Sequence, residues 1–385
     1  MWKHITANFL TLAVVAVLAV AVVVQIGKSR WDEPGPLAEA AFFEVPPGAS
    51  LHDVSEALQA AGVIASGTVF RLGAQYTERA DDLKFGTYEI PAGATMPEVL
   101  DIITSGGPSV VPFTVTYLVR SIGPEIRVRE RRPGETQAVE VATYAPGDPV
   151  PAAFTALLDR DVPITWRVAI APGLTSWEVV EGLKGADFLT GEVEVPAEGT
   201  LAPDTYQVDR GSARDALLAR MTSIQERRLA DAWANRAPGL PIDTPEEALI
   251  LASIIEKETS VPEERGLVAS VFVNRLNTGM RLQTDPTVIY GVTEGRGALG
   301  RGLRRSELDT RTPWNTYQID GLPPTPIANP SAESLAAAVD PDSSDFVFFV
   351  ADGTGGHAFA ETLAEHNANV ARWRAIEAER ATDDG

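Results

Sequence analysis

Two glutamates close a short apolar stretch in the middle of the chain. Residues 250–259 read ILASIIEKET, so Glu256 and Glu258 stand two positions apart behind a run of aliphatic side chains. A carboxyl group that is partly removed from water has a raised pKa and can donate a proton near neutral pH. The stretch therefore suggests general acid chemistry, and the question is which glutamate supplies the proton.

An α-helix through these residues separates the two carboxyl groups. At about 100° per residue, the neighbouring aliphatic side chains fall within about 60° of Glu258, which continues the apolar stripe. Glu256 falls about 160° away, on the opposite side. Periodicity alone leaves two interpretations of Glu258. It is either a proton donor at the edge of a core, or a helix end whose head lies in water or pairs with an arginine such as Arg265 or Arg281.

Two polar segments follow this helix. Residues 279–291 (GMRLQTDPTVIYG) and 314–330 (WNTYQIDGLPPTPIANP) combine hydroxyl, amide and aromatic side chains with prolines, and we expect the first to be a loop closed by Pro286. Stiff loops of this composition suit the recognition of sugar hydroxyls, N-acetyl groups and sugar faces. Each side chain could instead satisfy backbone groups of a folded loop. The candidate substrate-binding residues are Gln283, Thr284, Asp285, Tyr290, Asn315 and Tyr317.

Other chemistries find little support in the composition. The chain has no cysteine, and its histidines beyond the N-terminal region show no spacing typical of a zinc site. There is no nucleotide-binding glycine motif, so we expect no metal and no cofactor. DGTGGH, from Asp352, is interpreted as a tight turn that presents His357 in a structural role. Asp plus Glu number 53 against 32 for Lys plus Arg, and this net charge of -21 argues against a nucleic-acid partner.

The N-terminal region predicts a membrane anchor. Residues 9–26 (FLTLAVVAVLAVAVVVQI) contain only Thr11 and Gln25 as polar residues and span about 27 Å as a helix. We predict a short N-terminus at 1–8, an uncleaved transmembrane helix at 9–27 and a linker at 28–40. A cleaved signal peptide is the alternative, but no convincing small-x-small cleavage site follows. The flanking positive charges are nearly balanced and do not set the orientation.

A weak repeat and a change in pattern divide the rest of the chain. Residues 45–58, 90–103 and 170–183 share a strand end, a glycine turn, a Ser or Thr N-cap and an amphipathic helix. The first two copies frame a small α+β domain at 41–108, with its second strand within 83–90. Residues 109–168 alternate apolar and polar side chains and predict a β-rich insertion. Residues 169–385 predict a mainly helical α+β domain, including a strand within 345–352 and a closing helix at 359–381.

These motifs resemble a known family. LASIIEKETSVPEERGLVASVFVNRLNTGMRLQTDPTVIYG, WNTYQIDGLPPTPIANP and FVFFVADGTGGHAFAETLAEHN are similar to the YceG-like family of endolytic murein transglycosylases, the MltG type. The resemblance covers nearly all of the chain outside 109–168. It implies an α+β chain with an N-terminal transmembrane helix, a LysM-like domain at 41–108 and a catalytic domain at 169–385.

The resemblance also implies a function and a location. The family consists of single-pass inner-membrane proteins with a cytoplasmic N-terminus and a periplasmic catalytic domain. Its members cleave the MurNAc–GlcNAc bond inside peptidoglycan glycan strands, leave 1,6-anhydroMurNAc ends and so end strand elongation, which makes peptidoglycan synthases candidate partners. This reaction makes the enzyme a carbon-oxygen lyase. The catalytic acid is the second glutamate of the family's EKE motif, which maps onto Glu258, and Glu256 is the fallback.

Three residues depart from the family pattern, and the sequence leaves two alternative functions. Trp314 stands where the family pattern leads us to expect Tyr, Thr325 where Gly is common, and Ala202 where an aromatic is usual. One rival function is a muramidase that uses water, with Asp285 or Glu263 as its second carboxylate. The other is a peptidoglycan-binding scaffold without catalytic activity, in which Glu258 is structural.

Overall fold

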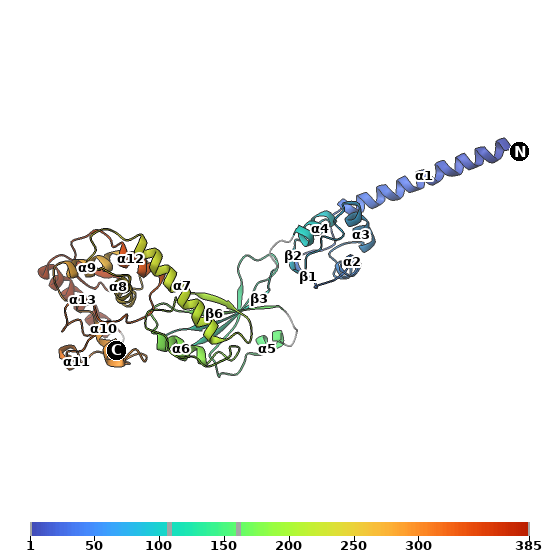
Figure 1. Ribbon diagram of the computed structural model, residues 1–385. Helices are drawn as coiled ribbons and strands as arrows, with labels where there is room; N and C mark the ends of the chain where they lie inside the picture. The colour runs from blue at the N-terminus through green and yellow to red at the C-terminus, as the bar shows by residue number, and fades with distance from the viewer. Residues whose placement is uncertain (1, 106–109, 159–162, 384–385) are drawn as a thin grey trace. The chain divides into compact units, whose positions relative to one another are not determined.

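The computed structural model describes residues 2–105, 110–158 and 163–383 (Figure 1). The chain divides into two compact units. Unit 1 comprises residues 1–114, 128–141 and 153–164, and unit 2 comprises residues 115–127, 142–152 and 165–385. Both units contain helices and strands, so the prediction of a mixed α+β chain with an N-terminal apolar helix is confirmed. The predicted boundary between residues 108 and 109 lies outside the described residues.

The N-terminal helix α1 (Trp2–Asp32) contains the predicted apolar span. Its segment Leu12–Asp32 has a mean hydropathy of 2.2 and none of it is buried, as expected for a helix that meets lipid rather than protein. The helix continues past residue 27 to Asp32, so the first residues of the predicted linker are helical. Trp31 packs on Phe70 with ring centroids 6.1 Å apart, and Gly35 N donates to Ala94 O at 3.2 Å. These contacts attach the chain to unit 1 immediately after the helix.

Unit 1 begins with a small domain of two strands and three helices. Its two strands pair antiparallel, with Ala41 opposite Ile90 and Val45 opposite Gly86, and the second strand lies within the predicted 83–90. A buried cluster that includes Phe70 and Ile90 forms its core. The elements are β1 (Ala41–Val45), α2 (Leu51–Ala60), α3 (Gly67–Tyr76), β2 (Gly86–Ile90) and α4 (Met96–Ser105).

The three sequence repeats fold as predicted at their helix starts. Ser50 and Asp53 exchange side-chain and backbone hydrogen bonds at the start of α2, and Thr95 and Glu98 do the same at α4. Thr175 and Glu178 form the third such capping box, before α6 (Ser176–Lys184). An N-cap of this kind stabilises a helix by about 1 kcal/mol, so each repeat fixes where its helix begins.

A five-stranded sheet follows, with the order β5-β4-β3-β6-β7. The boundary predicted at residue 168 falls inside β6, which lies between β3 and β7 in the sheet. The segment expected to be a separate insertion thus supplies sheet strands. In β4 and the turn that follows it, Arg127 pairs with Glu125 and Arg131 pairs with Glu89. The elements are β3 (Phe113–Val119), β4 (Glu125–Glu130), β5 (Val139–Tyr144), α5 (Ala152–Leu158), β6 (Ile164–Ile170) and β7 (Thr205–Val208).

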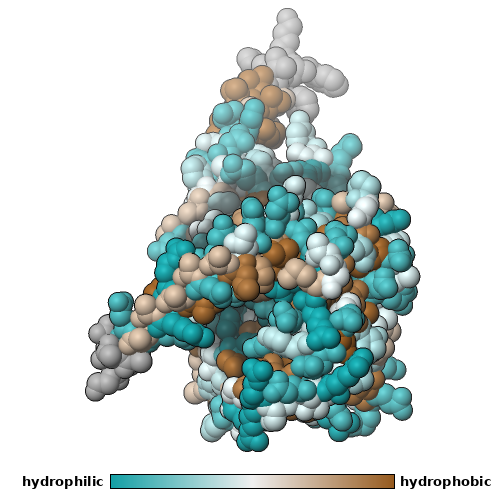
Figure 2. Space-filling model, turned by 90° about the vertical axis from the view of Figure 1, so that its left-hand side faces the viewer, coloured by the Kyte–Doolittle hydropathy of each residue, from teal (hydrophilic) through white to brown (hydrophobic). Residues whose placement is uncertain are grey.

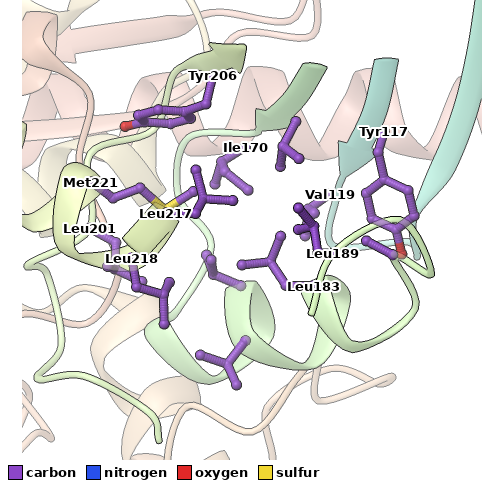
Figure 3. Packing of buried hydrophobic residues seen from close by; sticks show 14 of the residues in the cluster. Tyr117, Val119, Ile170, Leu183, Leu189, Leu201, Tyr206, Leu217, Leu218 and Met221 are labelled. Carbon is purple, nitrogen blue, oxygen red and sulfur yellow. The ribbon is translucent and has the colours of Figure 1, made fainter. Parts of the chain in front are cut away.

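One hydrophobic cluster joins the strands of unit 2 to two helices (Figure 3). Tyr117 and Ile170 come from strands, Leu183 from α6, and Leu218 and Met221 from α7 (Arg214–Ala234). Full burial of each such side chain contributes about 1.5–3 kcal/mol. On the face that Figure 2 shows, hydrophilic residues predominate and hydrophobic residues are scattered among them.

The helix with the two glutamates, α8 (Pro245–Glu258), is buried on every side. It packs against α7, α9 and α12, and all residues from Ala248 to Ile255 are buried. The side of α8 opposite the apolar stripe is therefore also covered by protein, because α7 and α12 close over it. The remaining elements are the 3-10 turn η1 (Pro262–Glu264), α9 (Arg265–Asn277), α10 (Asp285–Thr293), α11 (Arg305–Asp309), α12 (Ala332–Val339), β8 (Phe348–Ala351), β9 (His357–Ala360) and α13 (Leu363–Asp383).

Two local predictions in this region are wrong. Pro286 does not close a loop but stands at the start of α10, where a proline with its fixed φ is favoured, so Asp285 and Tyr290 lie on a helix. Phe359 does not begin the closing helix, because it pairs with Phe349 in a two-stranded antiparallel sheet. α13 starts only after this hairpin.

Candidate active site

Glu258 occupies the last position of α8. Thr244 caps the helix at its other end by accepting a hydrogen bond from Glu247 N, and Pro245 follows at the first helical position. Thr259 leaves the helix in an extended conformation, with φ -134° and ψ 135°. Glu258 therefore stands at the point where the chain leaves α8 and turns toward η1.

The Glu258 side chain is partly buried, and its Oε1 accepts a hydrogen bond from the hydroxyl of Thr284. Burial raises the pKa of Glu258, and the Thr284 hydroxyl opposes this because it stabilises the carboxylate. The negative charge of Asp285 raises the pKa further, while His357 and Arg275 act in the opposite direction. A larger fraction of Glu258 is therefore protonated near neutral pH than of an ordinary glutamate.

A buried cluster of threonines fixes the donor of that hydrogen bond. Thr316 Oγ1 accepts from Thr284 N at 3.0 Å and lies 2.9 Å from Thr287 Oγ1, which donates to Thr284 O at 2.7 Å. Gln283 N donates to Thr316 O at 3.2 Å, and Gln283 has the unusual positive φ of 49°. A non-glycine residue in this conformation is strained and is held by its surroundings. The turn before α10 is thus tied to the loop that carries Thr316.

The same loop brings a tyrosine to Asp285. Tyr317 OH donates to Asp285 Oδ1 at 2.7 Å. Burial raises the pKa of Tyr317, and the Asp285 carboxylate raises it further. Tyr317 therefore stays neutral and acts as a hydrogen-bond donor at ordinary pH. Arg281 Nε lies 2.9 Å from Asp320 Oδ1, so Arg281 pairs with Asp320 rather than with Glu258.

Two of the predicted binding residues lie in supporting contacts. Asn315 is fully buried, donates to three backbone carbonyls and accepts from Tyr317 N at 3.0 Å. Tyr290 lies on α10, packs against Trp314 with the ring planes tilted by 54° and the centroids 5.7 Å apart, and donates to Glu198 Oε2 at 3.3 Å. The structure thus brings Glu258, Thr284, Asp285 and Tyr317 together and gives Asn315 and Tyr290 internal partners.

Glu256, the fallback acid, has its own partners. Its Oε2 accepts from Ser331 N at 2.9 Å, from Ser331 Oγ at 2.5 Å and from Ser334 Oγ at 2.7 Å. Ser331 is the N-cap of α12, so a carboxylate here stabilises the start of that helix. Glu256 and Glu258 are therefore used on different sides of α8, as the helix periodicity predicts.

A cavity of about 280 Å³ opens beside Glu258. It is lined by Glu258, Thr259 and Ser260, by the glycine turn between β8 and β9, and by Trp373 and Arg380 of α13. His357 also lines it, and its Nδ1 lies 2.7 Å from Glu264 Oε2 while its backbone N donates to Glu264 Oε1 at 2.8 Å. The sequence predicts a structural role for His357 in a tight turn. Nothing in DGTGGH indicates its contact with Glu264 or its position beside the end of α8.

The sequence model of the YceG-like family matches residues 43–372. This range includes the site and most of both units. The chain belongs to the YceG-like family.

The relatives of this YceG-like protein include characterised bacterial proteins. It is 27% identical over 342 residues to the endolytic murein transglycosylases of two Streptococcus pneumoniae strains, D39 and R6, a match that covers 85% of this chain. It is 28% identical over 331 residues to the endolytic murein transglycosylase of Bacillus subtilis, covering 84% of this chain and 82% of that protein. The match spans 57% of the length of the pneumococcal relatives.

A solved structure is also similar. The crystal structure of a putative yceG-like protein from Listeria monocytogenes is 24% identical, with a TM-score of 0.43 over 86% of this chain and 98% of that one.

Two departures from the YceG-like pattern are direct partners. Trp314 Nε1 donates to Thr325 Oγ1 at 2.9 Å, so the indole and the hydroxyl that replace the expected residues are satisfied by each other. Ala202 is fully buried and accepts from Tyr206 OH at 2.7 Å. None of these three residues contacts Glu258 through a hydrogen bond that the described residues contain.

Proposed function

We propose that this YceG-like protein is an endolytic lytic transglycosylase that cleaves the MurNAc–GlcNAc bond within peptidoglycan glycan strands. The observation that carries the proposal is the Glu258 carboxyl group, which is partly buried at the wall of a cavity, has a raised pKa and is held by Thr284. The names of its relatives in Streptococcus pneumoniae and Bacillus subtilis support the same activity.

The proposed reaction needs one carboxyl group in two roles. Protonated Glu258 gives its proton to the glycosidic oxygen as the bond from that oxygen to C1 of the muramic residue breaks. The carboxylate then accepts the proton of the muramic C6 hydroxyl, whose oxygen forms the new bond to C1. The product is a 1,6-anhydroMurNAc end, and no water enters the reaction. Glu258 is ready to act again once it has received the second proton.

The residues around Glu258 have separate proposed roles. Thr284 orients the carboxyl group, and Asp285 together with Tyr317 binds the saccharide and keeps Glu258 from ionising early. Gln283 is a further proposed contact with the sugar. Tyr290 and Asn315 support the loops through the partners described above, and we assign them positioning roles rather than contacts with substrate.

We also propose the location and the domain roles. Helix α1 crosses the inner membrane once, with the N-terminus in the cytoplasm and the catalytic region of unit 2 in the periplasm; its apolar, unburied surface supports this. The small domain is LysM-like, which the order β1-α2-α3-β2 with antiparallel strands supports. Peptidoglycan synthases are proposed partners, because an enzyme that ends glycan strands acts on the strands that they extend.

Product analysis tests the reaction class. We expect the full-length protein in detergent to convert purified glycan strands, in water enriched in ¹⁸O, to fragments with 1,6-anhydro ends and no added ¹⁸O. Mass spectrometry of the fragments measures both properties. Reducing ends carrying one ¹⁸O would contradict the proposal and establish the muramidase function instead, with Asp285 as the nearby second carboxylate.

The pH dependence of the reaction tests the role of Thr284. Its hydroxyl stabilises the Glu258 carboxylate, so Thr284→Val should raise the pKa of Glu258 further. Since the reaction begins with protonated Glu258, activity falls as pH rises through this pKa. We therefore expect the alkaline limb of the kcat/KM profile to move to higher pH.

Thr293→Val is the matched control for this measurement. It removes a hydroxyl of α10 that donates to Ile289 O and lies outside the threonine cluster. Its alkaline limb should stay at the wild-type position. Equal shifts in the two variants, or a downward shift in Thr284→Val, would contradict the assigned role.

A further inference from the structure

Unit 1 carries two exposed apolar side chains on one face of α3. Leu72 is 61% exposed and Tyr76 is 90% exposed, and the four-residue spacing places them on neighbouring turns. Between them, Gly73 meets the end of the anchor helix, because a Cβ at Gly73 would lie 2.1 Å from Cζ3 of Trp31. The α3 backbone therefore lies directly against the Trp31 ring, as the position of α3 beside the end of α1 in Figure 1 also indicates.

The depth of Trp31 in a bilayer follows from the helix geometry. The apolar run ends at Ile26, and five further residues at about 1.5 Å each place Trp31 about 7.5 Å beyond it. The headgroup layer on each side of a bilayer is roughly 5–8 Å thick. Trp31 thus lies at headgroup depth, where tryptophan is enriched in membrane proteins.

The connection after α1 is too short for unit 1 to move away from this depth. Pro34 bridges to Thr95, and Gly35 N donates to Ala94 O at 3.2 Å, within three residues of the helix end. With Trp31 packed on Phe70 and Gly73, the foot of α1 forms part of unit 1. α3 is consequently held at the level of the lipid headgroups.

We infer that α3 is a second contact of this protein with the membrane, with Leu72 and Tyr76 inserted into the bilayer interface beside Trp31. The inference rests on the proposed crossing of the membrane by α1. A leucine and a tyrosine at this depth remove apolar surface from water, and the tyrosine hydroxyl can remain hydrated. The contact is apolar, so the acidic net charge of -21 does not oppose it and zwitterionic lipid suffices. Unit 1 then rests on the bilayer instead of being suspended above it.

The absence of native cysteine allows a direct test. Single variants Leu72→Cys and Tyr76→Cys of the full-length chain are labelled with a polarity-sensitive fluorophore and placed in zwitterionic nanodiscs. We expect a blue-shifted emission and loss of intensity when lipids with a nitroxide on the headgroup are included. Neither residue belongs to the proposed catalytic site, so both variants should keep wild-type activity.

Phe85→Cys is the matched control in the same unit. Phe85 is 73% exposed but precedes β2, whose other end leads to the residues that contact the foot of α1. The length of that strand, about 16 Å, separates it from the interface. A label there should show neither the blue shift nor the quenching.

A label at a fourth position tests the membrane crossing of α1 separately from the membrane contact of α3. Val20→Cys lies within the apolar span of α1 and should be quenched by a nitroxide on the acyl chain. If Val20 is quenched while position 76 responds no more than position 85, the anchor stands and the inference about α3 is overturned. If Val20 is not quenched, the proposed membrane crossing fails and the inference fails with it. Neither outcome touches the proposed glycan cleavage, which product analysis tests separately.

Discussion

Replacing Glu258 by glutamine is expected to slow the formation of 1,6-anhydro ends by about 10²–10⁴-fold, the usual contribution of a general acid and base. Glutamine has nearly the same shape and can still accept the Thr284 hydroxyl bond at its amide oxygen, so the fold and the cavity should be retained. What it lacks is the proton for the glycosidic oxygen and the basic oxygen for the C6 hydroxyl. Chromatography and mass spectrometry of glycan digests over time measure the rate.

Glu256→Gln is the matched control, two positions earlier on the same helix. Its partners are Ser331 and Ser334 at the start of α12, so the change should affect thermal stability slightly and leave the reaction rate near that of wild type. If Glu258→Gln cleaves strands as fast as wild type, the assignment of the acid is wrong. A loss of cleavage in Glu256→Gln alone would instead assign the acid to Glu256, the fallback.

The separation of the two glutamates onto different sides of α8 could be predicted from the sequence because it depends only on local geometry. Helix periodicity fixes the direction of a side chain from its position, and the two directions differ by about 160°. The contact that holds Glu258 could not be predicted in the same way. Thr284 is 26 positions away, and its hydroxyl reaches Glu258 only because Thr316, on a third segment, fixes the turn.

The errors in the fold have the same physical origin. Alternation in residues 113–119 identifies a strand, but it does not name the neighbouring strand, and β6 begins more than forty residues later. Asp285–Pro286 is a good helix start as well as a good turn, and only packing against α8 decides for the helix. The pair of Glu264 and His357 spans 93 positions and leaves no local signal in the sequence.

Asn315 offers the clearest distinction between a binding residue and a positioning residue. Its Nδ2 donates to Glu307 O at 3.1 Å, Leu308 O at 3.0 Å and Thr310 O at 2.6 Å, and its Oδ1 accepts from Tyr317 N. The side chain is 0% exposed, so water cannot replace these bonds. The amide group therefore holds the C-terminal end of α11 against the loop that carries Thr316 and Tyr317.

Asn315→Ala is accordingly expected to lower the free energy of unfolding by about 2–4 kcal/mol, since each buried group left without a partner costs about 1–3 kcal/mol. For a unit of this size the melting temperature should fall by roughly 10 °C, because 1 kcal/mol corresponds to about 2–4 °C. Circular dichroism during heating measures it. Asn277→Ala, at the exposed end of α9, is the matched control and should stay within about 0.5 kcal/mol of wild type.

If Asn315→Ala keeps the wild-type melting temperature but raises KM for glycan strands, its amide contacts the sugar, as its position in the polar loop first predicts. A large loss of stability with an unchanged KM in the folded fraction would instead establish that Asn315 supports the fold without contacting the sugar.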